Sequence, residues 1–133
     1  MKALQGLNVW NRACGLAIRT CEALRECTDS TFRDAITRSA LGIATLIADG
    51  YERDSKHQFA LYLRSAKGTC SELRTQLYIA TQLELLAVPQ ATELMQETVE
   101  VARLLKGLIS WCDSRSQAPD PKIRYNTAER ADL

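Results

Sequence analysis

The sequence predicts an all-α fold, an antiparallel up-down-up-down four-helix bundle, from three observations. Ala, Leu, Glu, Arg and Gln, which favour helices, are prominent among the 133 residues. Only 6% of the residues are aromatic, and three prolines and six glycines interrupt the chain, so little of it suits a sheet. Four segments have apolar residues at spacings of three and four, and short links join them, which favours antiparallel neighbours.

The first expected helix covers residues 7–27, and its apolar spacing directs one face toward the other helices. That face is Leu7, Trp10, Cys14, Ala17, Cys21 and Leu24. The second helix is expected over residues 31–48, after N-cap candidates in Thr28-Asp29-Ser30, and Gly50 follows it at a typical C-terminal position. Its core face is Phe32, Ile36, Ala40, Ile43 and Ile47.

The third helix is expected over residues 55–86, because Ser55 and Gln58 form a capping box at its start. Its core face is Phe59, Leu63, Ala66, Cys70, Leu73, Leu77 and Ala80. The fourth is expected over residues 89–113, with Pro89 in the first turn. Its core face is Leu94, Val101, Leu105, Leu108 and Cys112. The bundle domain is therefore 1–113, and the polar remainder, 114–133, is expected to be a C-terminal tail.

The third helix carries a second apolar stripe, opposite its core face at about 100° per residue. The stripe consists of Leu61, Gly68, Ile79 and Leu86, with Glu72 beside them. This side of an isolated bundle should be polar, so we interpret the stripe as the interface of a homo-oligomer. The alternative is that these are scattered surface residues, which are normal in monomers.

Composition limits the partners and the compartment. The net charge is +1 and the pI is about 7.6, which gives no global electrostatic case for nucleic acid. No apolar run approaches the roughly 20 residues of a membrane span, and the first residues have no signal-peptide core. The five cysteines are an odd number without a CxxC motif, so we expect free thiols and a cytoplasmic location.

No catalytic, cofactor-binding or metal-binding residues are expected. His57 is the only histidine, whereas carboxylate-bridged di-iron bundles need two Glu-x-x-His motifs. Cys70 and Cys112 are expected at different levels of the bundle, so they should not converge on zinc. Phosphate-loop, dinucleotide-binding and nucleophile-elbow motifs are missing from the sequence. We expect a non-enzymatic protein, with a small enzyme or metal-binding bundle as the weaker alternative.

Basic residues form two short stripes that could hold the phosphates of RNA or DNA. They are Arg12 and Arg19 on the first helix and Lys56, Arg64, Lys67 and Arg74 on the third. The alternative is an ordinary solvated face, with Glu22, Glu26 and Glu72 offsetting the charge.

A polar set, Arg38, Asp49 and Glu72, has two readings. It forms either ordinary ion pairs at the edge of the bundle or a buried network that fixes helix register or the subunit contact. The sequence leaves both open.

Several segments resemble one bacterial family in order and spacing from Leu4 to about Trp111. The matching segments are Leu7-Asn8-Val9-Trp10, Ile36-Thr37-Arg38-Ser39-Ala40, Ile47-Ala48-Asp49-Gly50, Ser55-Lys56, Phe59, Leu63, Ala66, Gly68-Thr69, Glu72-Leu73 and Gln76-Leu77. They are similar to the four-helix bundle proteins encoded in intervening sequences of 23S rRNA genes, a group that includes the accessory variability determinant of diversity-generating retroelements. The sequence departs from the family pattern at Ala35, Ala44, Leu46 and Asp49.

The resemblance implies a non-enzymatic bundle that assembles into a ring of five. For the retroelement relatives it also implies a basic surface that engages reverse transcriptase and nucleic acid. We therefore expect a structural or interaction protein that forms a homo-oligomer, a pentamer as the resemblance implies, and needs no cofactor and no membrane. An accessory protein that binds RNA or DNA through basic faces of the oligomer is the alternative.

Overall fold

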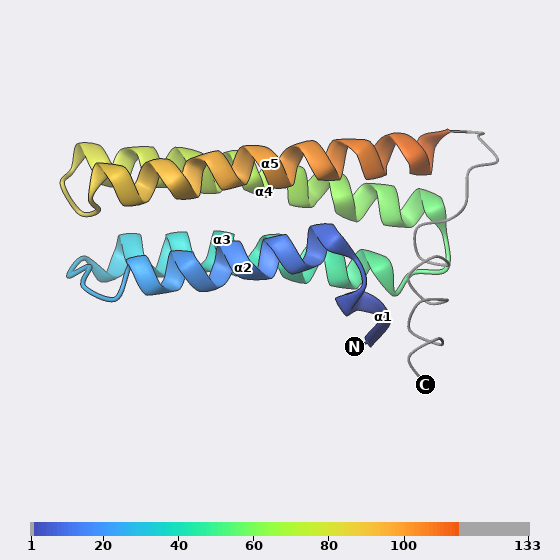
Figure 1. Cartoon of the computed structure of the whole chain (residues 1–133), viewed down its shortest axis with the longest axis horizontal. Coiled ribbons are helices and arrows are strands. Elements are labelled where there is room, and N and C mark those ends of the chain that lie inside the picture. Colours follow the sequence, from blue (N-terminus) through green and yellow to red (C-terminus); the bar gives the residue numbers. More distant parts are fainter. Residues whose placement is uncertain (1, 115–133) are drawn as a thin grey trace.

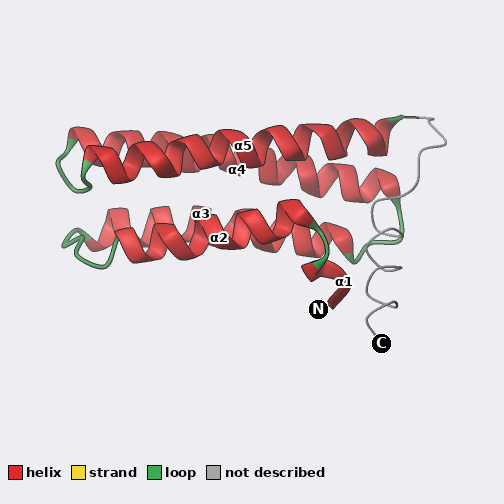
Figure 2. Ribbon diagram, in the orientation of Figure 1, coloured by secondary structure: helices red, strands yellow, loops and turns green. Residues whose placement is uncertain are grey.

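The computed structural model describes residues 2–114, and the regular elements in that range are all helices (Figure 2). They are α1 (Lys2–Gln5), α2 (Asn8–Ala23), α3 (Ser30–Tyr51), α4 (Lys56–Gln82) and α5 (Val88–Asp113). The described part of the chain is therefore all-α, as its composition and periodicity predict. The expected tail lies outside the described residues, apart from Ser114.

The four long helices lie lengthwise beside one another, and α1 is a short turn before them (Figure 1). α4 packs along α3 and α5, and α2 also packs along α3 and α5. The α2–α3 and α4–α5 links lie at one end of the domain, and the α3–α4 link lies at the other (Figure 1). α4 thus has neighbours on two sides and keeps an open outer side.

The core lies between the long helices and includes the seam that the spacing predicts on α4. Phe59 is 1% exposed there, and the rest of the seam is fully buried: Leu63, Ala66, Cys70, Leu73, Leu77 and Ala80. On α3, Ile36, Ala40, Ile43 and Ile47 are fully buried as well. Phe32, at the start of the expected α3 face, is only partly buried. Apart from Phe32, the spacing identifies the inward faces of these two helices correctly.

The inward face of α2 matches the expected one only in part. Leu7, Ala17 and Leu24 are buried as expected, but Trp10, Cys14 and Cys21 are only partly buried. The buried residues of α2 that the pattern did not include are Val9, Ala13, Leu16 and Thr20. Thr20 is the reason that the pattern misleads, because a polar residue stands at the centre of the inward face. Its hydroxyl donates a 2.7 Å hydrogen bond to the Leu16 carbonyl oxygen, which satisfies the buried group.

Side chains cap α3 and α4 where the sequence predicts. An Asp29 carboxylate oxygen accepts a 3.1 Å hydrogen bond from the Phe32 backbone N–H. The Ser55 hydroxyl accepts one of 3.2 Å from the Gln58 backbone N–H. Each cap satisfies a donor that the first turn of a helix leaves without an intrahelical partner.

Gly50 lies within α3 rather than just beyond it, because α3 continues to Tyr51. None of the described glycines has a positive φ, so Gly50 is not a left-handed C-cap. A Cβ atom at Gly50 would stand 2.5 Å from the Tyr62 Cβ and 3.1 Å from the Phe59 Cδ1. Glycine is needed here because α3 and α4 approach closely next to the link that joins them.

α4 ends at Gln82, four residues before the expected end, in a Schellman turn. Glu84 has a left-handed backbone conformation with φ 59°. The Leu85 N–H donates a 2.9 Å hydrogen bond to the Ala80 carbonyl oxygen, and the Glu84 N–H donates one of 3.0 Å to the Thr81 carbonyl oxygen. The turn directs Leu86 into the core, where it is 7% exposed. The assignment of Leu86 to the outer stripe was therefore wrong. Glycine usually occupies the left-handed position, so Glu84 gave no sequence signal of the turn.

Candidate functional site

The open side of α4 carries the other four residues of the stripe, which we call the outer α4 face: Leu61, Gly68, Glu72 and Ile79. Leu61 is 49% exposed and Ile79 is 40% exposed. Leu83, one turn beyond Ile79, extends the apolar surface with 54% exposure. Sequence reasoning missed Leu83, although its spacing of four from Ile79 was a usable signal.

Gly68 lies on this face without a packing reason inside the chain. A Cβ atom built there would meet no described atom within 4 Å. In contrast with Gly50, intrachain contacts do not require glycine at this position. The absence of a side chain leaves room for another molecule to approach the α4 backbone.

The polar set Arg38, Asp49 and Glu72 does not form a network. All three residues are exposed, and no ion pair within the described residues joins them. Arg38 and Asp49 lie on the same helix, about 16 Å apart at 1.5 Å per residue, so their side chains cannot meet. Asp49 instead pairs with Arg53 at 3.0 Å. The Arg53 guanidinium also donates a 2.8 Å hydrogen bond to the Tyr62 hydroxyl, which ties the end of α3 to α4.

Five of the six candidate phosphate contacts take part in intrachain interactions, and four of them lie outside the groove described below. Arg12 and Arg19 of α2 both bind the Glu97 carboxylate of α5, the second through a 2.9 Å contact. The Arg74 Nε donates a 2.8 Å hydrogen bond to the Thr98 hydroxyl. The Lys56 ammonium lies 4.1 Å from the centre of the Trp111 ring. These contacts give each of these cations a role in holding helices together.

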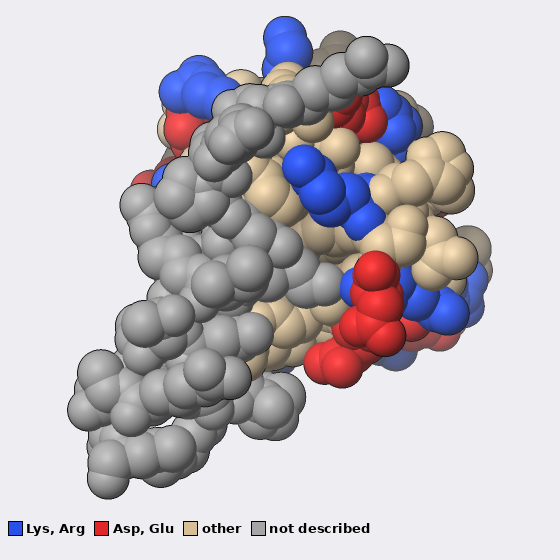
Figure 3. Space-filling view, turned by 90° about the vertical axis from the view of Figure 1, so that its right-hand side faces the viewer, with Lys and Arg blue, Asp and Glu red and all other residues tan. Residues whose placement is uncertain are grey.

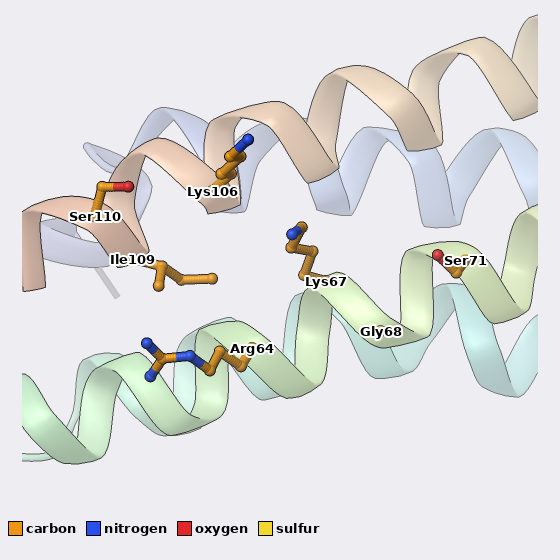
Figure 4. Close-up of a pocket in the computed structure, with 7 residues that line it drawn as sticks. All are labelled: Arg64, Lys67, Gly68, Ser71, Lys106, Ile109 and Ser110. Carbon is orange, nitrogen blue, oxygen red and sulfur yellow. The ribbon is translucent and has the colours of Figure 1, made fainter. Parts of the chain in front are cut away.

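The remaining two, Arg64 and Lys67, line a groove between α4 and α5 (Figure 4). We call this the α4–α5 groove; it has a volume of about 550 Å³, and its lining is Arg64, Lys67, Gly68, Ser71, Lys106, Ile109 and Ser110. Arg64 also pairs with Asp113 near the end of α5. Sequence reasoning did not single out Lys106, because only the pairing of α4 with α5 brings it beside Lys67.

The charge at the end of the domain where α5 finishes is mixed. Figure 3 views the end of the domain where α5 finishes, and basic and acidic side chains are intermingled on the visible described surface. This agrees with the net charge of +1. The α4–α5 groove therefore differs from this end of the domain, because the charged residues that line it are all basic.

The thiols of Cys14 and Cys70 are held in the neutral form, and residues 2–114 contain no cluster of metal ligands. Within residues 2–114, no three His, Cys, Asp or Glu side chains cluster as metal ligands would. Burial raises the pKa of the Cys70 thiol from 9.0 to about 11, although nearby Arg74 lowers it slightly. Burial also raises the pKa of Cys14. Both therefore remain neutral thiols near neutral pH, and a neutral thiol is a poor nucleophile.

Comparison with known proteins identifies the family to which the chain belongs. No described helix is both long and apolar enough to cross a membrane, and no curated protein matches the sequence. A solved structure from Bacteroides thetaiotaomicron, a protein of unknown function from the S23 ribosomal protein family, has a similar fold with a TM-score of 0.71 and 20% identity. The match covers 76% of this chain and 97% of that one. The family model described as 23S rRNA-intervening sequence protein matches residues 5–107, so the chain belongs to that family.

Proposed function

We propose that this chain is a non-enzymatic structural subunit that assembles with copies of itself. In this proposal its four long helices form an antiparallel up-down-up-down bundle, and the outer α4 face is the contact surface. Five subunits is the number that the sequence resemblance implies. The observation that carries the proposal is the pair of half-exposed apolar side chains, Leu61 and Ile79, on the open side of α4.

The energetics favour covering this face. Burying the exposed half of a Leu or Ile side chain stabilises a contact by about 1 kcal/mol. Leu61, Ile79 and Leu83 would together supply about 3 kcal/mol for each copy of the face. Gly68 lies between Leu61 and Ile79 on the helix and would allow a partner backbone to approach α4.

Sedimentation velocity of the purified chain at micromolar concentration tests the assembly. Leu61→Glu and Ile79→Glu should each shift the protein toward the monomer, because a buried carboxylate would face an apolar contact. Ile18→Glu is the matched control, since Ile18 on α2 is 59% exposed and lies away from the outer α4 face. A wild-type chain that sediments as a monomer would overturn the proposal.

Binding of RNA or DNA is the second candidate. The observation that favours it is the gathering of Arg64, Lys67 and Lys106 in one groove. A gel-shift titration at several salt concentrations tests it, because phosphate contacts weaken as salt increases. The variants Lys67→Gln and Lys106→Gln should weaken any shift more than Arg12→Gln, since Arg12 is paired with Glu97. The absence of a shift at low salt would remove this candidate.

We also propose a cytoplasmic location. None of the five cysteines forms a disulfide within the described residues, and reduced thiols persist in a reducing compartment. The neutral state of Cys14 and Cys70 supports a structural role for these thiols. Replacing Cys14 or Cys70 should therefore weaken the packing of the helices and lower the stability of the fold.

A further inference from the structure

We propose that the α4–α5 groove binds a small anion with linked phosphate groups, at a site whose lining one chain supplies. The first argument is a pattern that α4 and α5 share. Lys67-Gly68-x-x-Ser71 on α4 and Lys106-Gly107-x-x-Ser110 on α5 have the same residue types at the same spacing. Both lysines and both serines line the one groove.

The second argument is the environment of the two lysines. On a helix, a lysine is commonly offset by a carboxylate three or four residues away. The positions three and four residues from Lys67 hold Leu63, Arg64, Cys70 and Ser71, and those around Lys106 hold Ala102, Arg103, Ile109 and Ser110. No ion pair within residues 2–114 neutralises either ammonium group. An anion in the groove would relieve the repulsion among these cations.

The contrast with the other cations of the chain supports this argument. Arg12 and Arg19 share Glu97, Arg53 pairs with Asp49, and Arg103 pairs with Glu100. Each of these four arginines therefore has a carboxylate partner, which neither lysine of the groove has among the described residues. Asp113 is the carboxylate nearest to the lining, and it pairs with Arg64. The two lysines still leave the groove with an excess of positive charge.

The third argument is the set of donors and their order. Figure 4 shows Lys67 extending from α4 toward α5, with Lys106 on the α5 side and Arg64 extending along α4. Ser110 lies toward one end and Ser71 toward the other, with the cations between them (Figure 4). Ammonium, guanidinium and hydroxyl groups are the donors that hold phosphate oxygens. An elongated row of them suits two linked phosphates better than one.

Ile109 adds an apolar wall to the groove. It is 9% exposed and projects from α5 toward the space between the helices (Figure 4). Charges beside such a wall interact more strongly than charges fully surrounded by water. The 550 Å³ of the groove lies within the range of small-molecule sites.

Isothermal titration calorimetry of the full chain with sodium pyrophosphate, at constant ionic strength, tests the proposal. Wild-type protein should show saturable binding with one site per chain. Lys67→Gln and Lys106→Gln should each weaken it by about tenfold or more, the effect of losing one charge-assisted hydrogen bond. Lys67→Arg should restore most of the affinity, because it restores the charge.

Arg103→Gln is the matched control. Arg103 lies on α5 three residues from Lys106, pairs with Glu100 and is outside the groove lining, and its replacement removes the same charge. Binding by this variant should change by less than about twofold, because exposed charges are screened by salt. Asp113→Asn should strengthen binding by about twofold to fivefold, since it releases Arg64 from an exposed ion pair.

Three results would overturn the proposal. The first is that pyrophosphate does not bind the wild-type protein. The second is that Arg103→Gln weakens binding as much as Lys67→Gln does, which would indicate general charge attraction. The third is that an RNA oligonucleotide without terminal phosphates binds through Lys67, whereas pyrophosphate and ADP do not bind. The last result would establish the groove as a nucleic-acid contact instead. Repeating the titration with Ile79→Glu separates this site from subunit assembly, because binding should survive whether or not the chain oligomerises.

Discussion

Replacing Gly50 with alanine gives the sharpest test of how α3 and α4 pack. The new Cβ would stand 2.5 Å from the Tyr62 Cβ and 3.2 Å from the Tyr62 Cγ. A Cβ cannot move without its backbone, so α3 and α4 must separate by about 1 Å to reach the ordinary 3.5–4.0 Å contact. Overpacking of this kind costs about 1–3 kcal/mol.

The same change also has a favourable part. Alanine favours a helix over glycine by about 1 kcal/mol. Because the clash falls on backbone-bound atoms of the neighbouring helix, we take the upper end of the overpacking cost. The net result should be a loss of about 2 kcal/mol in the free energy of unfolding.

Urea denaturation followed by circular dichroism at 222 nm measures this loss. Gly15→Ala on α2 is the matched control, because a Cβ there meets nothing within 4 Å. It should stabilise the protein by about 0.5–1 kcal/mol. Replacing glycine with alanine would then lower the free energy of unfolding at Gly50 and raise it at Gly15. A Gly50→Ala protein as stable as the Gly15→Ala protein would refute the close approach of α3 and α4.

Three further predictions concern individual side chains. Glu84→Gly should stabilise the chain by about 0.5–1 kcal/mol in urea denaturation, because it relieves a left-handed residue; an unchanged or lower stability would contradict the turn geometry. Glu97→Gln should destabilise it by about 1 kcal/mol, since Arg12 and Arg19 lose their shared carboxylate, and the loss should shrink in 1 M salt. The raised pKa of Cys70 means that the folded state holds this proton more tightly than the unfolded state, so its contribution is constant below pH 9 and decreases as pH rises toward about 11. Comparing unfolding from pH 8 to 11 with Cys70→Ala should show a shallower slope for the variant.

Periodicity predicted the fold well where apolar residues alone form the inward face. The seam of α4 from Phe59 to Ala80 is such a case, and so is that of α3 from Ile36 to Ile47. It held only in part on α2, where Thr20 occupies the buried centre and bonds its own helix. It failed at the end of α4, because Glu84 adopts a conformation that usually indicates glycine.

The candidate site also has one part that the sequence could predict and one part that it could not. The outer α4 face follows from spacing along one helix, so Leu61 and Ile79 could be found from the sequence. The α4–α5 groove depends on which two helices pair and at what level, and single-chain spacing does not contain that information. For the same reason Glu97, which joins α2 to α5 through Arg12 and Arg19, could not be identified.

Gly68 belongs both to the outer α4 face and to the lining of the α4–α5 groove. A partner subunit on that face would therefore border any ligand in the groove. Thermodynamic linkage is reciprocal, so a ligand that binds the assembled form more tightly must favour assembly by the same factor. In the proposed assembly, one hydrogen atom in place of a side chain would thus give the molecule a point at which subunit contact and ligand binding are coupled.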